Sequence, residues 1–280
     1  MAFSITRALN GTSLALAFVL ACAGTVAHSQ EAAPAAPAPA AETARSDLSP
    51  QCEAPNADIA TPAPLPTVAT LLEGNKKIRI LAIGSSSTYG VGASVRGKAY
   101  PAQLEQILEK TMSGVDVKII NRGVSGEIAA TTADRLKGEV ALTHPNLVLW
   151  QVGTNDALAH VPVADFENTV HTAVQRLKKK NIDVVLVGLQ YTPRFNRDEN
   201  YAAIREALKR LATAENVLYV RRYEAMQFIA KTRANLEMMA NDDFHLNDLG
   251  YQCMAEHVAH AVIANTFIRR KDATTAVRSN

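Results

Sequence analysis

The apolar positions of this 280-residue chain gather into short runs between residues 78 and 220, and amphipathic segments separate these runs. Each run has the length of a strand and is rich in Val, Ile and Leu, which is typical of a strand buried on both faces. Five strands are therefore predicted, at Ile78–Ile83, Val115–Ile120, Leu147–Val152, Val184–Leu189 and Val217–Val220.

The segments around these runs place apolar residues at helical spacing, with polar residues on the other faces. The apolar faces collect Leu104, Ile107, Leu108 and Met112, then Phe166, Val170, Val174 and Leu177, and finally Met254, Val258, Ala261 and Val262. Parallel neighbours must be joined by crossovers, so alternating strands and helices predict a parallel sheet with helices on both faces. The predicted fold class is α/β, a three-layer α/β/α sandwich with a five-stranded parallel sheet, formed by one domain over residues 67–268.

The amino-terminal residues have the pattern of an export signal. Arg7 precedes an apolar stretch over Leu14–Val26, and small residues follow up to Ser29, so residues 1–29 are predicted to be a signal peptide. The stretch is shorter than the roughly 20 residues that span a bilayer, which predicts no transmembrane span in the mature protein. The expected location is periplasmic or secreted. Lipidation of Cys22, in a sequence similar to a bacterial lipobox, is the alternative.

Alanine and proline dominate residues 30–66, a composition that resists helix and sheet, so this segment is predicted to be a linker. Residues 269–280 are predicted to be a basic flexible tail. Two cysteines remain once the leader is removed, and in an oxidising compartment such a pair is more often bonded than free. A disulfide between Cys52 and Cys253 is therefore predicted, with two free thiols as the alternative.

Composition and charge limit the classes of partner. Apolar residues make up 48% of the chain and charged residues 20%, which is ordinary for a globular protein. The net charge of +2 and the absence of a basic run longer than Lys178–Lys180 argue against a nucleic acid partner. The oligomeric state does not follow from the sequence.

Chemistry is expected in the loops that follow the strands, because the carboxyl ends of parallel strands meet at one edge of the sheet. The first strand leads into Gly84 and then the hydroxyl-rich stretch Ser85–Thr88. A hydroxyl there lies at a helix amino terminus, whose free N–H groups stabilise negative charge. This loop alone is compatible with a serine-rich turn, a phosphate cradle or a nucleophile.

Three further loops supply complementary groups. Gly123 follows the second strand and lets the backbone approach a ligand, and Asn155 follows the third strand with an amide donor. Asp242 and His245 stand three residues apart before the last helix. Acyl transfer requires a serine, a base held by a carboxylate, and donors for an oxyanion. A metal site is disfavoured because no second His or Cys lies at ligand spacing, and no cofactor is expected.

Together these four blocks resemble the SGNH hydrolases, also called the GDSL esterase and lipase superfamily, over Ile78–Ile263. The resemblance implies a flavodoxin-like α/β/α fold and hydrolysis of carboxylic esters without metal or cofactor. By position it implies Ser86 as the nucleophile, His245 as its general base and Asp242 as the acid that orients the base.

The resemblance also implies an oxyanion hole built from the backbone N–H groups of Ser86 and Gly123 and the side chain of Asn155. One position departs from the family motif, because Ser85 stands where the motif has aspartate. The departure removes a carboxylate from the loop but no member of the triad. No GxSxG sequence surrounds Ser86, which argues against the ordinary α/β-hydrolase family.

The implied function is that of an exported serine esterase for short acyl or O-acetyl esters, with a small-molecule or glycan ester as substrate. Two alternatives stay open. The first is a non-catalytic protein of the same fold that binds glycans or envelope polymers, and the intact triad argues against it. The second is a flavodoxin-like binder of phosphate or nucleotide, which would have no use for the pair Asp242 and His245.

Overall fold

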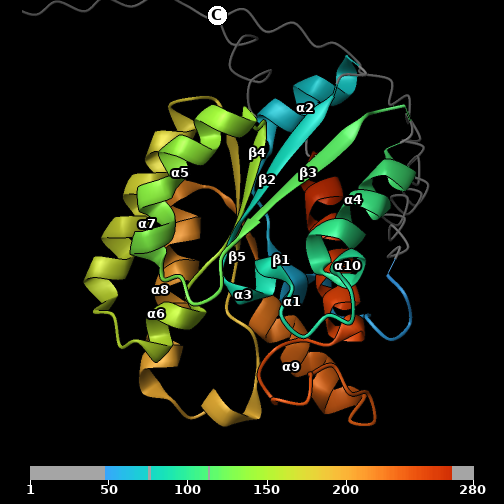
Figure 1. Ribbon diagram of the computed structural model, residues 1–280, viewed down its shortest axis with the longest axis vertical. Helices are drawn as coiled ribbons and strands as arrows, with labels where there is room; N and C mark the ends of the chain where they lie inside the picture. The colour runs from blue at the N-terminus through green and yellow to red at the C-terminus, as the bar shows by residue number, and fades with distance from the viewer. Residues whose placement is uncertain (1–47, 75–76, 113, 267–280) are drawn as a thin grey trace, which may run out of the picture. The chain divides into compact units, whose positions relative to one another are not determined.

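A twisted sheet crosses the middle of the protein in the computed structural model, which describes residues 48–74, 77–112 and 114–266 (Figure 1). Its strands are β1 (Ala60–Thr61), β2 (Ile78–Gly84), β3 (Val117–Gly123), β4 (Leu147–Gln151), β5 (Asp183–Val187) and β6 (Leu218–Val220). Their order across the sheet is β1-β6-β5-β4-β2-β3. All neighbouring strands run parallel except β1, which is antiparallel to β6.

Helices connect these strands and cover both faces of the sheet. The α-helices are α1 (Asn56–Ile59), α2 (Pro66–Glu73), α3 (Ser86–Tyr89), α4 (Tyr100–Thr111), α5 (Ala129–Thr143), α6 (Thr154–Leu158), α7 (Val163–Lys178), α8 (Glu199–Glu215), α9 (Arg222–Thr232) and α10 (Asp248–Thr266). Two short 3-10 turns, η1 (Arg96–Lys98) and η2 (Pro193–Phe195), complete the elements of the described ranges. No helix in these ranges has the length and apolar character needed to cross a bilayer.

Strand side chains alternate between two hydrophobic cores, one on each face of the sheet. On β2, Ile78 and Ile80 belong to one core, whereas Leu81 and Ile83 belong to the other. The first core is closed by α4 and α10, and the second by α5, α7 and α8, which lie on opposite sides of the sheet in Figure 1. Because both faces are covered, the central strands β4 and β5 are buried along their whole length and are almost entirely apolar in sequence. The predicted three-layer α/β/α sandwich is confirmed.

The sheet has six strands in the described ranges, so the predicted number of five is wrong. The additional strand is β1, in which Ala60 pairs with Val220 of β6. It lies within the segment predicted to be a linker without helix or sheet, where α1 also forms and where Ile59 and Leu65 are buried. A two-residue strand is too short to show a hydrophobic period, and its pairing depends on β6, which is distant in sequence.

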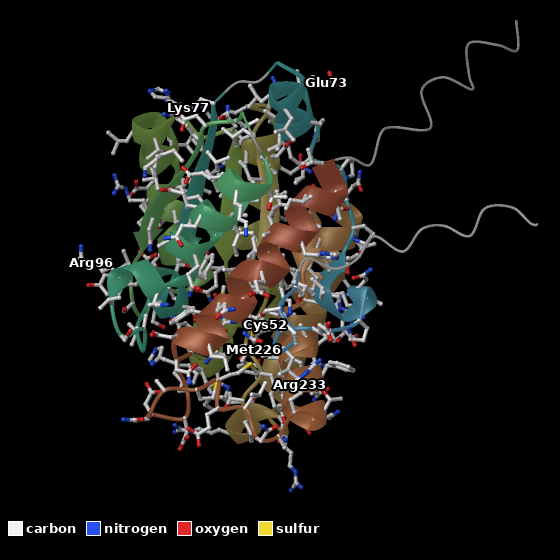
Figure 2. All side chains as sticks on the ribbon, turned by 90° about the vertical axis from the view of Figure 1, so that its right-hand side faces the viewer. Cys52, Glu73, Lys77, Arg96, Met226 and Arg233 are labelled. Carbon is white, nitrogen blue, oxygen red and sulfur yellow. A yellow bond between two sulfur atoms is a disulfide. The ribbon has the colours of Figure 1, made fainter. Side chains whose placement is uncertain are left out.

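The residues before β1 are fastened to α10 and α9. Cys52 forms a disulfide with Cys253, 201 residues further along the chain. Ser49 donates its backbone N–H and its hydroxyl to the Glu256 carboxylate at 2.8 and 2.9 Å. Arg233 donates to the Glu53 carbonyl at 2.9 Å, near the position of Cys52 in Figure 2. The second half of the predicted linker therefore packs on the domain. The predicted signal peptide, the first part of the linker and the tail lie outside the described residues.

A buried histidine beside this disulfide couples the anchored segment to pH. His257 of α10 is 3% exposed, and its Nε2 lies 2.7 Å from the carbonyl oxygen of Cys52. Burial lowers the pKa of His257, and the hydrogen bond to Cys52 and the charge of Glu256 oppose this shift only in part. The folded protein therefore holds a neutral ring at pH values where the unfolded chain, with a histidine pKa of about 6.5, already takes up a proton.

Acid should consequently favour the unfolded state through His257. Its contribution to stability is complete above the unfolded pKa and is lost as the pH falls below it. We expect the Tm to fall between about pH 7.5 and about pH 5.5 more steeply in the wild type than in His257→Gln, whose amide can still donate to Cys52. His160→Asn, a change at an exposed histidine, is the matched control and should follow the wild type. Equal slopes in His257→Gln and the wild type would contradict the prediction.

Candidate active site

Ser86 begins helix α3 directly after β2, at the end of the sheet where α6 also lies (Figure 1). The strand turns sharply into the helix at Gly84, whose φ is +144°. A Cβ at Gly84 would lie 2.4 Å from the carbonyl oxygen of Gln151, so only glycine fits there. As the first residue of the helix, Ser86 has no intrahelical acceptor for its backbone N–H.

The hydroxyl of Ser86 meets the ring of His245. His245 Nε2 lies 3.0 Å from Ser86 Oγ, and His245 Nδ1 lies 2.5 Å from Asp242 Oδ2. The His245 side chain is 17% exposed, whereas the Asp242 side chain is 48% exposed. The structure thus brings Ser86, His245 and Asp242, which are far apart in sequence, into one chain of hydrogen bonds.

A tight turn aims His245 at the serine. Asp242 Oδ1 accepts the backbone N–H groups of Phe244 and His245 at 3.0 and 2.8 Å, which closes an Asx turn around Asp243. Asp243 has a φ of +53°, a left-handed conformation that Asp tolerates better than most residues. Ala240 then donates to the His245 carbonyl at 2.8 Å. The acid therefore fixes both the ring and the backbone of the histidine.

These contacts also set the charge of the acid. Partial burial disfavours ionisation of Asp242, but the hydrogen bonds from the His245 ring and from the backbone of His245 and Phe244 outweigh it. They lower the pKa of Asp242 to about 2. The carboxylate is therefore ionised at neutral pH and suited to accept a hydrogen bond from Nδ1–H. With its proton on Nδ1, a neutral His245 ring presents an unprotonated Nε2 to Ser86 Oγ.

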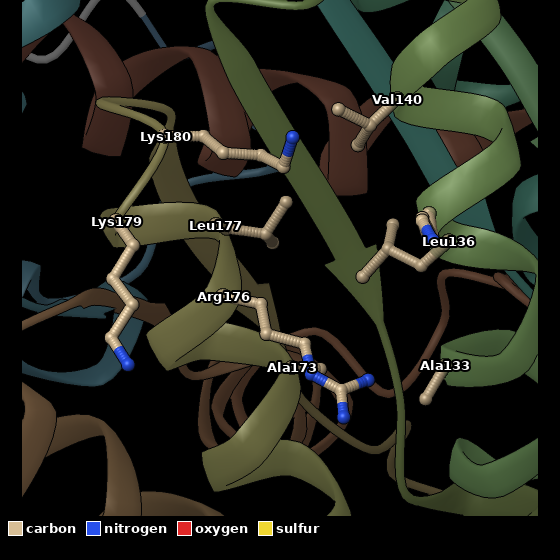
Figure 3. A pocket seen from close by; sticks show the side chains of 9 residues that line it. Ala133, Leu136, Val140, Ala173, Arg176, Leu177, Lys179 and Lys180 are labelled. Carbon is tan, nitrogen blue, oxygen red and sulfur yellow. The ribbon is translucent and has the colours of Figure 1, made fainter.

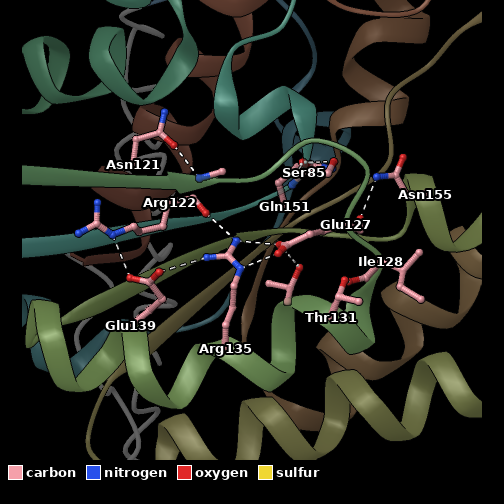
Figure 4. A network of polar contacts seen from close by, with 12 residues as sticks. Ser85, Asn121, Arg122, Glu127, Ile128, Thr131, Arg135, Glu139, Gln151 and Asn155 are labelled. Carbon is pink, nitrogen blue, oxygen red and sulfur yellow. Dashed lines mark hydrogen bonds and ion pairs between the residues drawn. The ribbon is translucent and has the colours of Figure 1, made fainter.

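The two other residues predicted to form the oxyanion hole, Gly123 and Asn155, already make hydrogen bonds. Gly123 packs against α3, so closely that a Cβ at this position would lie 2.1 Å from the backbone nitrogen of Tyr89. Its N–H donates to Asn121 Oδ1 at 2.9 Å, and Asn155 Nδ2 donates to the Glu127 carbonyl at 2.8 Å (Figure 4). The Asn155 amide carries a second hydrogen, whereas the Gly123 N–H would have to be shared with a ligand.

An ion-pair network supports the loop between Gly123 and α5. Arg135 donates to both carboxylate oxygens of Glu127 at 2.7 Å and to the carbonyl oxygen of Arg122 at 2.6 Å (Figure 4). Glu139 pairs with Arg122 at 2.9 Å. The backbone carbonyl of Glu127 accepts from the amide of Asn155, so this network lies next to that amide.

Ser85, the residue that departs from the family motif, bonds to a neighbouring strand. Its backbone N–H and its hydroxyl both donate to Gln151 Oε1, at 3.1 and 3.0 Å. The Gln151 side chain is 2% exposed and ends β4, the strand next to β2. The amide oxygen of Gln151 therefore accepts both hydrogen bonds that Ser85 donates. The turn is held without a carboxylate at position 85.

Sequence reasoning missed two buried glutamines at this edge of the sheet. Gln151 follows the apolar stretch LVLW, and Gln190 follows VVLVGL. Gln190 is 1% exposed and donates through Nε2 to the Phe244 carbonyl at 2.6 Å, next to His245. A lone amide at the end of an apolar run was the available signal, since a buried amide requires hydrogen-bond partners.

A separate groove of about 510 Å³ lies between α5 and α7 (Figure 3). Apolar and basic side chains line it: Ala133, Leu136, Lys137, Val140, Ala173, Arg176, Leu177, Lys179 and Lys180. None of these residues belongs to the loops that carry Ser86, Asp242 or His245. We therefore assign the groove no part in the candidate active site.

Residues 51–267 match the model of the non-GDSL lipase-like family. The match covers most of the chain, so the protein belongs to this family and, with it, to the SGNH hydrolase superfamily. The family description agrees with the presence of Ser85 in place of the aspartate of the GDSL motif.

Two proteins named as esterases and a crystal structure are similar to this chain. Esterase TesA of Pseudomonas aeruginosa is 26% identical over 116 residues, which are 41% of this chain and 56% of that protein. An arylesterase of Vibrio mimicus is 25% identical over 119 residues, 42% of this chain and 58% of that protein. The matches thus span little more than half the length of these relatives. The crystal structure of a two-domain esterase active on acetylated mannans has a TM-score of 0.66 and 18% identity, over 78% of this chain and 58% of that chain, which shows a shared fold.

Proposed function

We propose that this protein is an exported serine esterase that cleaves short acyl or O-acetyl esters through an acyl-enzyme. The observation that carries the proposal is the 3.0 Å contact between Ser86 Oγ and His245 Nε2, with Asp242 on the other ring nitrogen. A serine hydroxyl is a weak nucleophile until a base takes its proton, and an oriented imidazole is that base. A binding protein has no need of this arrangement.

In the proposed reaction, Ser86 Oγ attacks the ester carbonyl carbon while His245 Nε2 takes the serine proton. The oxyanion of the tetrahedral intermediate accepts hydrogen bonds from Asn155 and the backbone N–H of Ser86, with Gly123 as the third donor. His245 then gives the proton to the leaving alcohol, and the acyl group stays on Ser86. Water, deprotonated by His245, attacks the acyl-enzyme and releases the carboxylic acid and the free serine.

Two observations support the substrate class and the compartment. The relatives named above are esterases, and the one with the similar crystal structure acts on acetylated mannans, which favours small acyl groups on glycans as substrates here. A disulfide such as that between Cys52 and Cys253 persists in oxidising compartments, which favours export to the periplasm or the medium. The proposed leader, residues 1–29, would direct that export.

The proposal is tested by covalent labelling with a fluorophosphonate, a reagent that phosphonylates activated serines. We expect one adduct per chain, on the tryptic peptide that follows Arg79 and ends at Arg96, with fragment ions assigning it to Ser86. Ser86→Ala should abolish the adduct, and Ser85→Ala should keep it. Labelling that survives Ser86→Ala, or an unlabelled wild type that also fails to hydrolyse 4-nitrophenyl acetate, would overturn the proposal.

A further inference from the structure

A buried guanidinium without a carboxylate lies behind the candidate active site. Arg222, the first residue of α9, is 2% exposed. Its Nη1 and Nη2 each lie 3.2 Å from Ser87 Oγ, and Nη2 donates to Gln190 Oε1 at 2.8 Å. Within the described residues no carboxylate pairs with Arg222, and its Nε has no hydrogen-bond partner.

This placement is unfavourable for stability in several ways. A buried cation without a carboxylate loses hydration that no opposite charge replaces. A cation at the first residue of a helix also meets the positive end of the helix dipole. Burial lowers the pKa of Arg222, and the groups that face it are phenols rather than acids, namely Tyr251, Tyr201 and Tyr100. Packing and folding therefore do not explain the presence of an arginine here.

The contacts of Arg222 connect the two halves of the candidate triad. On one side, Ser87 is the residue after Ser86 in α3. On the other side, Gln190 uses its remaining amide group to donate to the Phe244 carbonyl at 2.6 Å, and Phe244 precedes His245. The guanidinium thus stands between the helix that carries the serine and the turn that carries the histidine.

Gln190 is itself held in place. Tyr201 donates its hydroxyl to the Gln190 carbonyl at 2.6 Å, and Ser87 Oγ lies 3.4 Å from Gln190 Oε1. A planar guanidinium with several donors in fixed directions can bond to Ser87 and Gln190 at once, which an ammonium on a flexible stem does less well. Hydrogen bonds therefore link Ser87, Arg222, Gln190 and the Phe244 carbonyl without a break.

We propose that Arg222 is a positioning residue, whose guanidinium sets the separation of Ser86 Oγ and His245 Nε2 through Ser87 on one side and Gln190 on the other. The inference rests on the proposed esterase function and goes beyond it, since Arg222 is buried and bonds to Ser87 and Gln190 rather than to Ser86, His245 or Asp242. A misplacement of reacting groups by about 1 Å costs on the order of 100-fold in rate, so loss of this link should affect turnover rather than binding.

The first test is Arg222→Met, assayed with 4-nitrophenyl acetate. We expect kcat to fall by about 10- to 100-fold with KM within about twofold of the wild type, and the Tm should not fall, because methionine removes a buried unpaired charge. The matched control is Arg221→Met, at the adjacent residue, which bonds to the Ala57 carbonyl and lies 3.7 Å from the Glu224 carboxylate. It should leave kcat within about twofold of the wild type.

Gln190→Glu is the second variant. Its carboxylate still accepts from Arg222 and pairs with that charge, but it cannot donate to the Phe244 carbonyl. We expect the fold to be retained and kcat to fall by about 10- to 100-fold, so that activity and stability separate. The double variant with Arg222→Met should lose less than the product of the two single losses, because both changes break the same link.

Several results would overturn the inference. These are a folded Arg222→Met protein with wild-type kcat, a loss confined to KM, or independent losses in the double variant. If Arg222→Met does not fold, wild-type kcat in Gln190→Glu would overturn it equally. A wild type without Ser86-dependent hydrolysis would remove the proposed function, whereas Ser86-dependent hydrolysis that survives Arg222→Met would remove the positioning role alone.

Discussion

Ser86→Ala is expected to lower kcat/KM for a short-chain ester by roughly 10,000- to 1,000,000-fold, because alanine cannot form the acyl-enzyme. That range corresponds to about 5 to 8 kcal/mol of transition-state stabilisation. His245 Nε2, 3.0 Å from the serine oxygen, would then have no hydroxyl to deprotonate. The measurement is hydrolysis of 4-nitrophenyl acetate and butyrate by the full chain, with circular dichroism and Tm as checks of folding.

Ser85→Ala is the matched control for this prediction. It removes a hydroxyl from the preceding residue and breaks the 3.0 Å bond to Gln151, but it keeps the backbone N–H that bonds to the same oxygen. Loss of one such hydrogen bond costs about 1 kcal/mol, so this variant should keep at least about a tenth of the wild-type rate. If the two alanine variants lose activity to the same extent, Ser86 has no special role in the reaction.

The layers of the fold could be predicted from the sequence because a strand that is buried on both faces forms a continuous apolar run. Runs such as LVLW in β4 are apolar throughout, since Val148 and Trp150 face one core while Leu147 and Leu149 face the other. β1 has no such apolar run. It pairs with β6 through two residues of an alanine- and proline-rich segment, and that pairing is decided by a partner about 160 residues away.

The site could be predicted in part, for a similar reason. Chain order and the rule that ligand sites lie at the carboxyl ends of parallel strands brought the loops of Ser86, Gly123 and Asn155 to one edge. No such rule predicts the hydrogen bonds that support the candidate site from behind. The partner of a buried amide or guanidinium is fixed only when distant segments pack. The sequence therefore did not indicate that Gln190 and Arg222 lie between the segments that carry Ser86 and His245.

Asn155→Ala is expected to lower kcat by roughly 100- to 1,000-fold and to change KM little, because an oxyanion donor acts on charge that develops only in the transition state. In the structure one Asn155 amide hydrogen goes to the Glu127 carbonyl at 2.8 Å, and the second hydrogen is the one proposed to reach the oxyanion. Asn155→Asp should be at least as damaging, since a carboxylate repels the oxyanion and accepts rather than donates.

A loss in Asn155→Ala could also arise from movement of the loop that Asn155 ties down, and the control must separate these causes. Arg135→Met weakens the same loop by removing the bonds to Glu127 and to the Arg122 carbonyl, while leaving the Asn155 amide intact. We expect Arg135→Met to lower kcat by less than about tenfold.

The decisive measurement is the affinity of a boronic acid that mimics the tetrahedral intermediate. It should weaken in Asn155→Ala by a factor close to the loss in kcat/KM, because both report binding of the oxyanion. Unchanged boronate affinity in Asn155→Ala, or an equal loss of kcat in Arg135→Met, would assign Asn155 to loop structure and leave the oxyanion to the backbone N–H groups.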